Sequence, residues 1–336
     1  MSAIHYTAPT LNISPVRIST MVTTAHVGTL IHLERLFDAI RVIPYWDLTN
    51  GVLKMDFRGR TKGTSWKDIL QKSNKKAAEG EGGDTKTFFF NQATIVVRME
   101  IAPMQWKEIN IKLFQNGGVQ MTGVRSEVMS QRAIEWLVTH IQSTITDQTV
   151  FEGPVAIHKM QIQLVNTDFS IGAKIRRDAL YKVLSEKYNL TVSYEPSIYQ
   201  GVKTKYFYND CRPASCPPGL CPCEKLCKGT GDGTALGQCK KITISPFQTG
   251  QIIITGARKM EQIDDAYRFM RRLFETHADE VLRKNYICPA SATADAAVAP
   301  TPTPTPAKKA AGWIHHPSPR NMFPIPVSDV VDAPGA

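Results

Sequence analysis

Apolar residues change their spacing in the same order twice along the chain. Residues 16–25 and 160–169 have the pattern of extended segments, and each is followed by a glycine and a stretch of helical spacing. The apolar positions of these stretches are Leu33, Leu36, Phe37 and Ile40, and then Ile175, Ala179, Leu180 and Val183. A longer amphipathic helix ends each series, with apolar faces at Ala133, Leu137 and Ile141, and at Ile263, Ala266, Tyr267 and Met270.

Short phrases recur in one order as well, which indicates a duplication. Segments 114–117 and 121–125 match 247–250 and 254–258, all at an offset of 133. An offset of 144 relates Ile18, Thr23, Gly28 and Ile31 to Ile162, Thr167, Gly172 and Ile175. A third match, at an offset of 150, pairs Asn50-Gly51-Val52 with Gln200-Gly201-Val202.

Hairpins are predicted through residues 116–118 and 249–250, because glycine lies between two strand-like runs in each case. A strand, a helix, several antiparallel strands and a second helix, all repeated, predict an α+β fold with helices on one face of the sheet. The other face then needs a partner or a polar surface.

The charge is uneven. The 336 residues include 40 Lys+Arg and 30 Asp+Glu, for a net charge of +10, and the neutral segment 287–336 leaves this excess on residues 1–286. A basic globular body is typical of nucleic-acid binding, although many basic proteins bind none. No stretch reaches the roughly 18–20 apolar residues of a membrane span. The N-terminus lacks the pattern of a secretory signal, so an intracellular protein is expected.

Composition predicts the domain boundaries. An N-terminal extension covers residues 1–15, and a disordered Pro/Ala/Thr-rich tail covers 287–336. The first repeat is 16–150, with an insertion at about 58–90 in which Lys72 to Thr87 is expected to be an exposed loop. Phe88 to Phe90 is expected to form a buried strand after it, with a platform for base stacking as the alternative. The second repeat is 151–286, with a Cys-rich insertion at 209–240.

Several segments in both repeats resemble the TATA-box-binding protein family. Ser193 to Gly201 (SYEPSIYQG) resembles the family's stirrup loop, and Ile175 to Leu180 is similar to a second sequence motif of the family. Phe247 to Arg258 and Phe114 to Arg125 resemble the two copies of its strand-turn-strand segment. The resemblance covers roughly residues 16–284. The cysteine insertion is most similar to divergent versions in large nucleocytoplasmic DNA viruses.

The resemblance implies a pseudo-symmetric saddle, in which a curved antiparallel sheet lies in the DNA minor groove and helices cover the convex face. A minor groove that is read through its width and deformability suits such an apolar sheet. The implied function is a transcription initiation factor that binds and bends DNA as a monomer and recruits general transcription factors or RNA polymerase subunits. The implied location is the nucleus or viral factory of an infected cell, or the virion.

The resemblance also implies roles for single residues. Phe114 and Phe247 take the positions of intercalating phenylalanines, and Tyr199 replaces the stirrup phenylalanine of the second repeat. By the Gly51 alignment, Thr49 takes the matching position in the first repeat. Base contacts are implied for Thr122, Thr255, Val22 and Ile253, and phosphate contacts for Arg125, Arg258 and Lys205.

The centre of the site departs from the family. Thr20 and Leu164 stand where the family has paired asparagines, although Asn166 follows two residues later on the same strand face. Gln120 replaces an apolar contact. The departures at Thr20, Leu164 and Thr49 favour an alternative function, a protein-interaction adaptor that has lost sequence-specific DNA binding. The retained Phe114 and Phe247 favour DNA binding.

Six of the seven cysteines lie between residues 211 and 239, in a segment rich in Gly and Pro. Such a segment lacks the apolar residues to fold alone, so thiolates at this density suggest a structural zinc site. The expected ligands are Cys221, Cys223, Cys227 and Cys239, with Cys211 and Cys216 as substitutes. Disulfides and free thiols are the alternatives.

The chain is not expected to be an enzyme. It has neither H-E-x-x-H nor G-x-S-x-G, and Cys288 lies at the start of the predicted tail, where a site is poorly preorganised. A nuclease or glycosylase that used such a saddle would need an attached catalytic domain, which the Pro-rich tail does not resemble.

Overall fold

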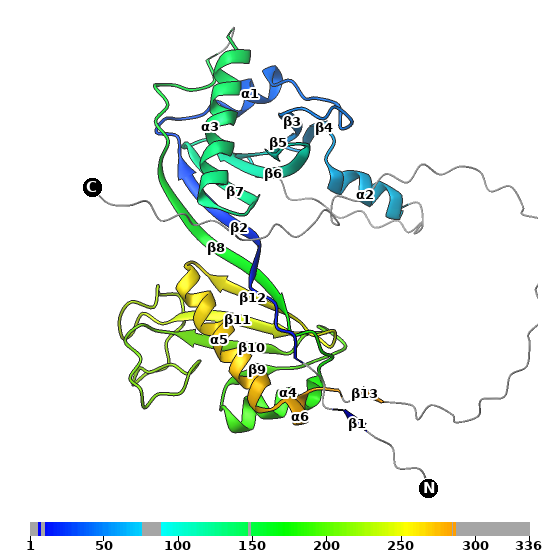
Figure 1. Ribbon diagram of the computed structural model, residues 1–336. Coiled ribbons are helices and arrows are strands. Elements are labelled where there is room, and N and C mark those ends of the chain that lie inside the picture. Colours follow the sequence, from blue (N-terminus) through cyan, green and yellow to red (C-terminus); the bar gives the residue numbers. More distant parts are fainter. Residues whose placement is uncertain (1–5, 8–10, 76–88, 147–148, 284, 287–336) are drawn as a thin grey trace, which may run out of the picture. The chain divides into compact units, whose positions relative to one another are not determined.

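The computed structural model of the chain describes residues 6–7, 11–75, 89–146, 149–283 and 285–286 (Figure 1). The described residues all belong to one unit, Met1–Pro289. The predicted tail, 287–336, lies outside the described residues, as do 76–88 of the predicted insertion.

Eleven strands form one sheet in which every neighbouring pair is antiparallel, in the order β4-β3-β5-β6-β7-β2-β8-β12-β11-β10-β9. The first half of the chain contributes β2 (Arg17–His26), β3 (Gly51–Phe57), β4 (Arg60–Gly63), β5 (Gln92–Ala102), β6 (Gln105–Phe114) and β7 (Gly118–Val124). The second half contributes β8 (His158–Ser170), β9 (Thr191–Ser193), β10 (Lys203–Tyr208), β11 (Lys240–Pro246) and β12 (Gln251–Ala257). Two short strands, β1 (Tyr6–Thr7) and β13 (Asn285–Tyr286), pair separately.

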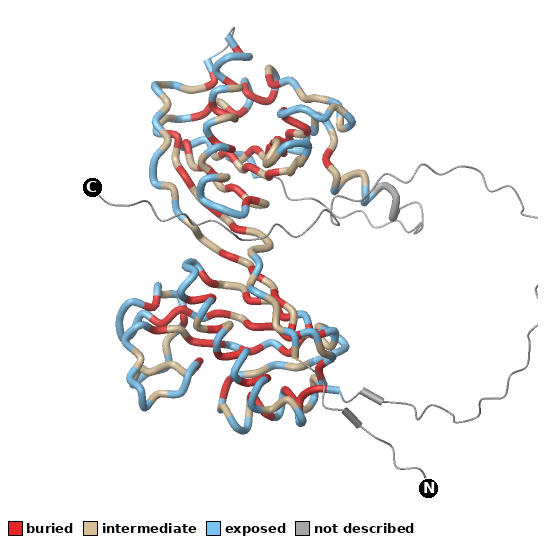
Figure 2. Tube along the Cα trace, in the orientation of Figure 1, coloured by how far each residue is buried: buried red, intermediate tan, exposed pale blue. Residues whose placement is uncertain are grey.

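The helices are α1 (Leu33–Ala39), α2 (Trp66–Lys75), α3 (Glu127–Thr144), α4 (Arg177–Lys182), α5 (Met260–Thr276) and α6 (Ala278–Val281), with a π-helical turn at Val183–Lys187. The α3 helix packs against β5 and β7, and α5 packs against β10, β11 and β12. Along β7, Val119 and Met121 are buried in this core, whereas Gln120 and Thr122 on the other face are half-buried. Figure 2 shows buried positions along the strands of both halves of the sheet. The predicted α+β class, with a large antiparallel sheet, is therefore confirmed.

The two predicted hairpins are confirmed as the β6–β7 and β11–β12 turns, and each needs its glycine. Gly117 has φ +88°, and a Cβ there would lie 2.2 Å from the carbonyl oxygen of Thr29. Gly250 has φ +91°, and a Cβ there would lie 2.2 Å from the carbonyl oxygen of Ala173. Both turns thus approach a backbone so closely that only glycine fits.

Two expectations about the insertion are wrong. Residues 72–75 belong to α2 instead of a loop, because Trp66, Ile69 and Leu70 have helical spacing and Asp68 lies in the first turn. Phe89 and Phe90 are not in a buried strand: they are 66% and 71% exposed, and β5 begins after them. Phe88 lies outside the described residues.

The alignment of Asn50-Gly51-Val52 with Gln200-Gly201-Val202 is also wrong. Val52 lies in β3, three strands outward from β7, whereas Val202 leads into β10, two strands outward from β12. Counted outward from the hairpins, β5 corresponds to β10 and β3 corresponds to β9. The first phrase lies at the start of β3 and the second lies directly before β10, so the two phrases have similar local positions in strands that do not correspond.

Candidate nucleic-acid interface

The predicted base contacts share one face of the four central strands. Thr122 pairs with Val22, and Val22 pairs with Leu164, so the three side chains form a row across the sheet. We call this face, which is opposite to the core under α3 and α5, the threonine face. On the central strands it carries Thr20, Val22, Gln120, Thr122, Leu164, Asn166, Ile253 and Thr255, all half-buried.

Thr20 and Asn166, at the centre of this face, are direct partners across β2 and β8. The Thr20 hydroxyl accepts a hydrogen bond from the backbone N–H of Gly123 at 3.2 Å. The Asn166 Oδ1 atom is buried and has no hydrogen-bond partner among the described residues. Because an unsatisfied buried acceptor costs about 1–3 kcal/mol, a donor that reached this oxygen would relieve that cost.

An aromatic pair marks the end of this face in the second half. The rings of Tyr199 and Phe247 lie 5.6 Å apart, edge to face, and the Lys203 ammonium lies 4.1 Å from the Tyr199 ring centroid. Gly201 makes room for both rings, since a Cβ there would lie 2.7 Å from Tyr199 and 3.2 Å from Phe247. Arg177 of α4 holds the loop by hydrogen bonds to Gln200 Oε1 at 2.8 Å and Gln248 Oε1 at 3.3 Å.

Phe90 takes the matching position in the first half, which the sequence motifs had assigned to Thr49. The β5–β6 register pairs Gln92 with Phe114, so Phe90 lies two residues before the partner of Phe114. The β10–β11 register, continued to Gly201 and Phe247, gives Tyr199 the same spacing. The Phe88–Phe90 run was a visible signal, but its role depends on strand pairing.

Arg125 and Arg258 lie at matched positions in the two halves, whereas Lys205 corresponds to Val96 in the first half. Arg125, Arg258 and Lys205 are exposed, and none of them forms an ion pair with another described residue. Beside Arg125, burial and then the guanidinium lower the pKa of Lys107 to about 8. Burial, and then Arg258, lowers the pKa of Lys240 in the same way. Lys107 and Lys240 share the 133 offset, but they lie two residues before the buried Ile109 and Ile242 and so are on the core side of β6 and β11, opposite to the threonine face.

Four cysteines come together in the connection between β10 and β11, residues 209–239. The sulfur atoms of Cys221, Cys223, Cys227 and Cys239 all lie within 4.8 Å of one another. The Cys239 sulfur lies 3.6 Å from those of both Cys221 and Cys223. These are the four predicted ligands, and together they could hold a metal ion.

Backbone donors and one side chain point at these sulfurs. Gly237 N–H donates to Cys223 Sγ at 3.0 Å, and Cys227 N–H donates to Cys221 Sγ at 3.5 Å. Asn209 Nδ2 donates to the buried Cys239 Sγ at 3.4 Å. Burial by itself raises the pKa of Cys221, but the backbone donors of Cys227 and Cys223 lower it to about 7. These bonds favour the Cys221 thiolate, the form that binds metals, whereas burial and the neighbouring thiols raise the pKa of Cys239.

The two predicted substitute ligands lie elsewhere in the connection. Cys211 Sγ contacts the carbonyl oxygen of Thr234 at 3.4 Å, and Cys216 Sγ contacts that of Pro217 at 3.7 Å. Neither belongs to the four-sulfur group. Among the described residues, the six cysteines in this segment form no disulfide.

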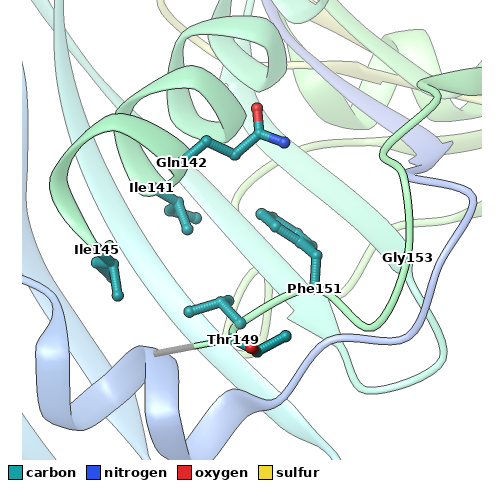
Figure 3. A pocket seen from close by; sticks show the side chains of 7 residues that line it. Ile141, Gln142, Ile145, Thr149, Phe151 and Gly153 are labelled. Atoms are coloured by element: carbon teal, nitrogen blue, oxygen red, sulfur yellow. The ribbon is translucent and has the colours of Figure 1, made fainter. Parts of the chain in front are cut away.

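A shallow hollow at the end of α3 carries no candidate chemistry. It lies between Ile141, Ile145 and the segment 149–153, and none of the residues lining it is titratable (Figure 3). Among the described helices, none has the length and apolar character needed to cross a membrane.

No protein-family model matches the chain. A protein of Acanthamoeba polyphaga mimivirus named "TATA-box-binding protein-like" is 29% identical over 286 residues, which covers 81% of this chain and 68% of that protein. Among solved structures, Methanococcus jannaschii TBP is 16% identical with a TM-score of 0.41, and the match covers 79% of this chain and 99% of that one. By this sequence match and by its motifs, the chain is similar to a divergent viral TATA-box-binding-protein-like protein.

Proposed function

We propose that this protein is a transcription initiation factor that binds duplex DNA in the minor groove through the threonine face and bends it. The observation that carries the proposal is the pair of aromatic positions at each end of that face, Phe90 with Phe114 and Tyr199 with Phe247. The matched strand orders support a pseudo-symmetric saddle, with one aromatic pair in each half and the threonines between them.

The chemistry of the face suits a minor groove. Its central residues are small or apolar and half-buried, so they can lie against sugars and base edges without many directed hydrogen bonds. The acid on this face of β8, Asp168, is paired with Arg17 at 2.9 Å, which limits its repulsion of phosphates. Aromatic wedges unstack base steps at a cost of a few kcal/mol, which the bent duplex offsets through a larger contact area.

The opposite face is proposed to recruit the transcription machinery. On α5, Arg271 pairs with Glu275 and Arg268 with Asp265, whereas Arg272 has no ion pair among the described residues. General transcription factors or RNA polymerase subunits are the proposed partners, on DNA bound by a monomer and without enzymatic activity. The proposed location is the nucleus or viral factory of an infected cell. We also propose that the protein is packaged in the virion.

The four cysteines are proposed to hold one structural zinc ion. Zinc is bound by four thiolates at about 2.3 Å in a tetrahedron, which requires sulfurs roughly 3.8 Å apart. The observed 3.6 Å separations fit this spacing. They exceed the roughly 2.05 Å of a disulfide bond. The site lies in the connection that leads into β11, so it would support the strand that ends beside Phe247.

Substituted duplexes test which groove is used. Duplexes that the protein binds are selected from a random pool and remade with inosine·cytosine in place of A·T, which keeps the minor-groove pattern and changes the major groove. Unchanged affinity is expected. A large loss of affinity would contradict minor-groove binding. If the protein enriches no duplex from the pool, the result would favour the alternative function, an adaptor that has lost DNA binding.

Phe90→Ala should weaken DNA binding by about 1–3 kcal/mol, the loss seen when one base loses an aromatic stacking partner. The matched control is Phe89→Ala, which removes a neighbouring ring that is equally exposed but one residue away from the position of Tyr199. Fluorescence anisotropy of a labelled duplex measures both variants. Equal losses in the two variants would exclude a specific role for Phe90.

Removing the two matched arginines, Arg125→Ala with Arg258→Ala, should reduce the slope of log affinity against log salt by about 2, roughly 0.9 for each lost phosphate contact. The control removes the same charge from the helices, as Arg132→Ala with Arg272→Ala. Titrations at several salt concentrations give the slopes. Equal slopes for the two double variants would mean that only the net charge matters.

A further inference from the structure

The outer strands of the threonine face are open in one half and covered in the other. In the first half, pairing continues the Thr122 row through Asn110 and Val96 to Lys54. In the second half, the matching row runs from Thr255 through Thr243 and Lys205 to Thr191. Lys205 and Thr191 are exposed, whereas Val96 is only 8% exposed and the Lys54 side chain only 16%.

Two segments of the same chain produce this burial. Residues 45–47 and 65–71, which we call the cover, contact the threonine face of β3, β5 and β6. Lys54 Nζ lies 2.9 Å from Asp68 in the first turn of α2, and 3.2 Å from Asp56 on its own strand. Glu108 accepts a hydrogen bond from the backbone N–H of Trp66 at 3.2 Å.

Arg98 lies two residues after Val96 on the same face, and the cover buries its charged side chain. It is only 3% exposed, its guanidinium lies 4.7 Å from the Tyr45 ring centroid, and it donates to the Asp47 carbonyl oxygen at 2.7 Å. The Tyr45 and Trp66 rings stack at 6.2 Å and so join the two segments of the cover. Two cations that could face phosphates, Lys54 and Arg98, are thus committed to contacts within the protein.

We propose that the cover withholds the part of the first half around Val96, Arg98 and Lys54 from DNA, so that the outer strands of this half meet the duplex only at the ends that carry Phe90 and Phe114, whereas the outer strands of the second half are open along the matching row. This inference rests on the proposed minor-groove function and adds that the protein binds its DNA site in a preferred direction. A saddle with two open ends binds a duplex in either direction with similar energy. A saddle with one covered end has an unequal footprint, which distinguishes the two directions.

Lysine reactivity tests the cover without DNA. Amine labelling of the free protein, read by mass spectrometry, should modify Lys54 severalfold more slowly than Lys205. Asp68→Asn, which removes the ion-pair partner of Lys54, should remove most of that difference. The control is Asp264→Asn, an equal charge change on the exposed side of α5. Equal rates for Lys54 and Lys205 in the unsubstituted protein would overturn the cover, whatever the protein binds.

Hydroxyl-radical footprinting on a selected duplex tests the consequence. The unsubstituted protein should protect unequal lengths on the two sides of the bend centre. Asp68→Asn should lengthen the shorter side and bind severalfold more tightly than Asp264→Asn. Symmetric protection by the unsubstituted protein would overturn the one-sided contact. Slow Lys54 labelling without any footprint would instead mean that the cover exists and the proposed function fails.

Discussion

Replacing Phe114 and Phe247 together by alanine is expected to abolish DNA bending and to weaken binding by roughly 2–6 kcal/mol, from the roughly 1–3 kcal/mol of stacking that each ring supplies. The two rings lie at opposite ends of the threonine face, and each is matched by an aromatic residue two positions before its partner in register, Phe90 for Phe114 and Tyr199 for Phe247. Without them the cations can still attract the duplex, but nothing unstacks a base step. Fluorescence energy transfer between the ends of a labelled duplex measures the bend.

Both phenylalanines are half-buried, so the double variant also needs a test of folding. Its thermal unfolding is compared with that of Val128→Ala, which removes an apolar side chain that is 69% exposed on α3, opposite to the threonine face. Val128→Ala should bend DNA normally. Normal bending by the folded double variant would contradict the intercalating role of these rings.

Loss of zinc is the second large effect expected. Metal analysis of the purified protein should find one zinc ion per chain, and a strong chelator or Cys223→Ser should remove it. Apparent zinc-binding energies in small thiolate sites reach about 10–16 kcal/mol near neutral pH, so the metal-free connection should lose its structure. Hydrogen exchange should then rise across residues 209–239 while α3 remains protected.

Cys211→Ser provides the control, because its sulfur contacts Thr234 and not the four-sulfur group. It should keep one zinc ion and normal exchange. The connection is also held by Gln262 of α5, which donates to the Asp232 carbonyl oxygen at 2.7 Å, so exchange near Asp232 reports whether the damage spreads toward α5. Full zinc content in Cys223→Ser would contradict the assigned ligand set.

Much of this fold could be predicted from the sequence because the same pattern of strands and helices occurs twice along the chain. The 133 offset places Phe114 and Phe247 at equivalent strand ends, and the alternation along β7 and β12 assigns Thr122 and Thr255 to the face opposite the core. The four clustered cysteines were also selected correctly from six. Their roles in binding DNA and zinc stay predictions.

The features that were missed depend on pairing between distant segments. Phe90 can be aligned with Tyr199 only when β5 is known to be the second strand outward from β7. The sequence does not reveal this order, because β4, α2 and residues 76–88 separate β3 from β5 along the chain. The cover has a similar cause. Asp68 and Lys54 are 14 residues apart, and nothing in their local sequence places them on the same side of the sheet as Thr122.

The most direct test of the central claim is a duplex labelled at both ends, measured by energy transfer with the unsubstituted protein at two salt concentrations. We expect the duplex ends to approach each other on binding, with an affinity that falls steeply as salt rises, because phosphate contacts supply much of the binding energy. The bend angle of the bound duplex should not depend on salt. Binding without any approach of the ends, or no binding at low salt, would contradict a bent minor-groove complex.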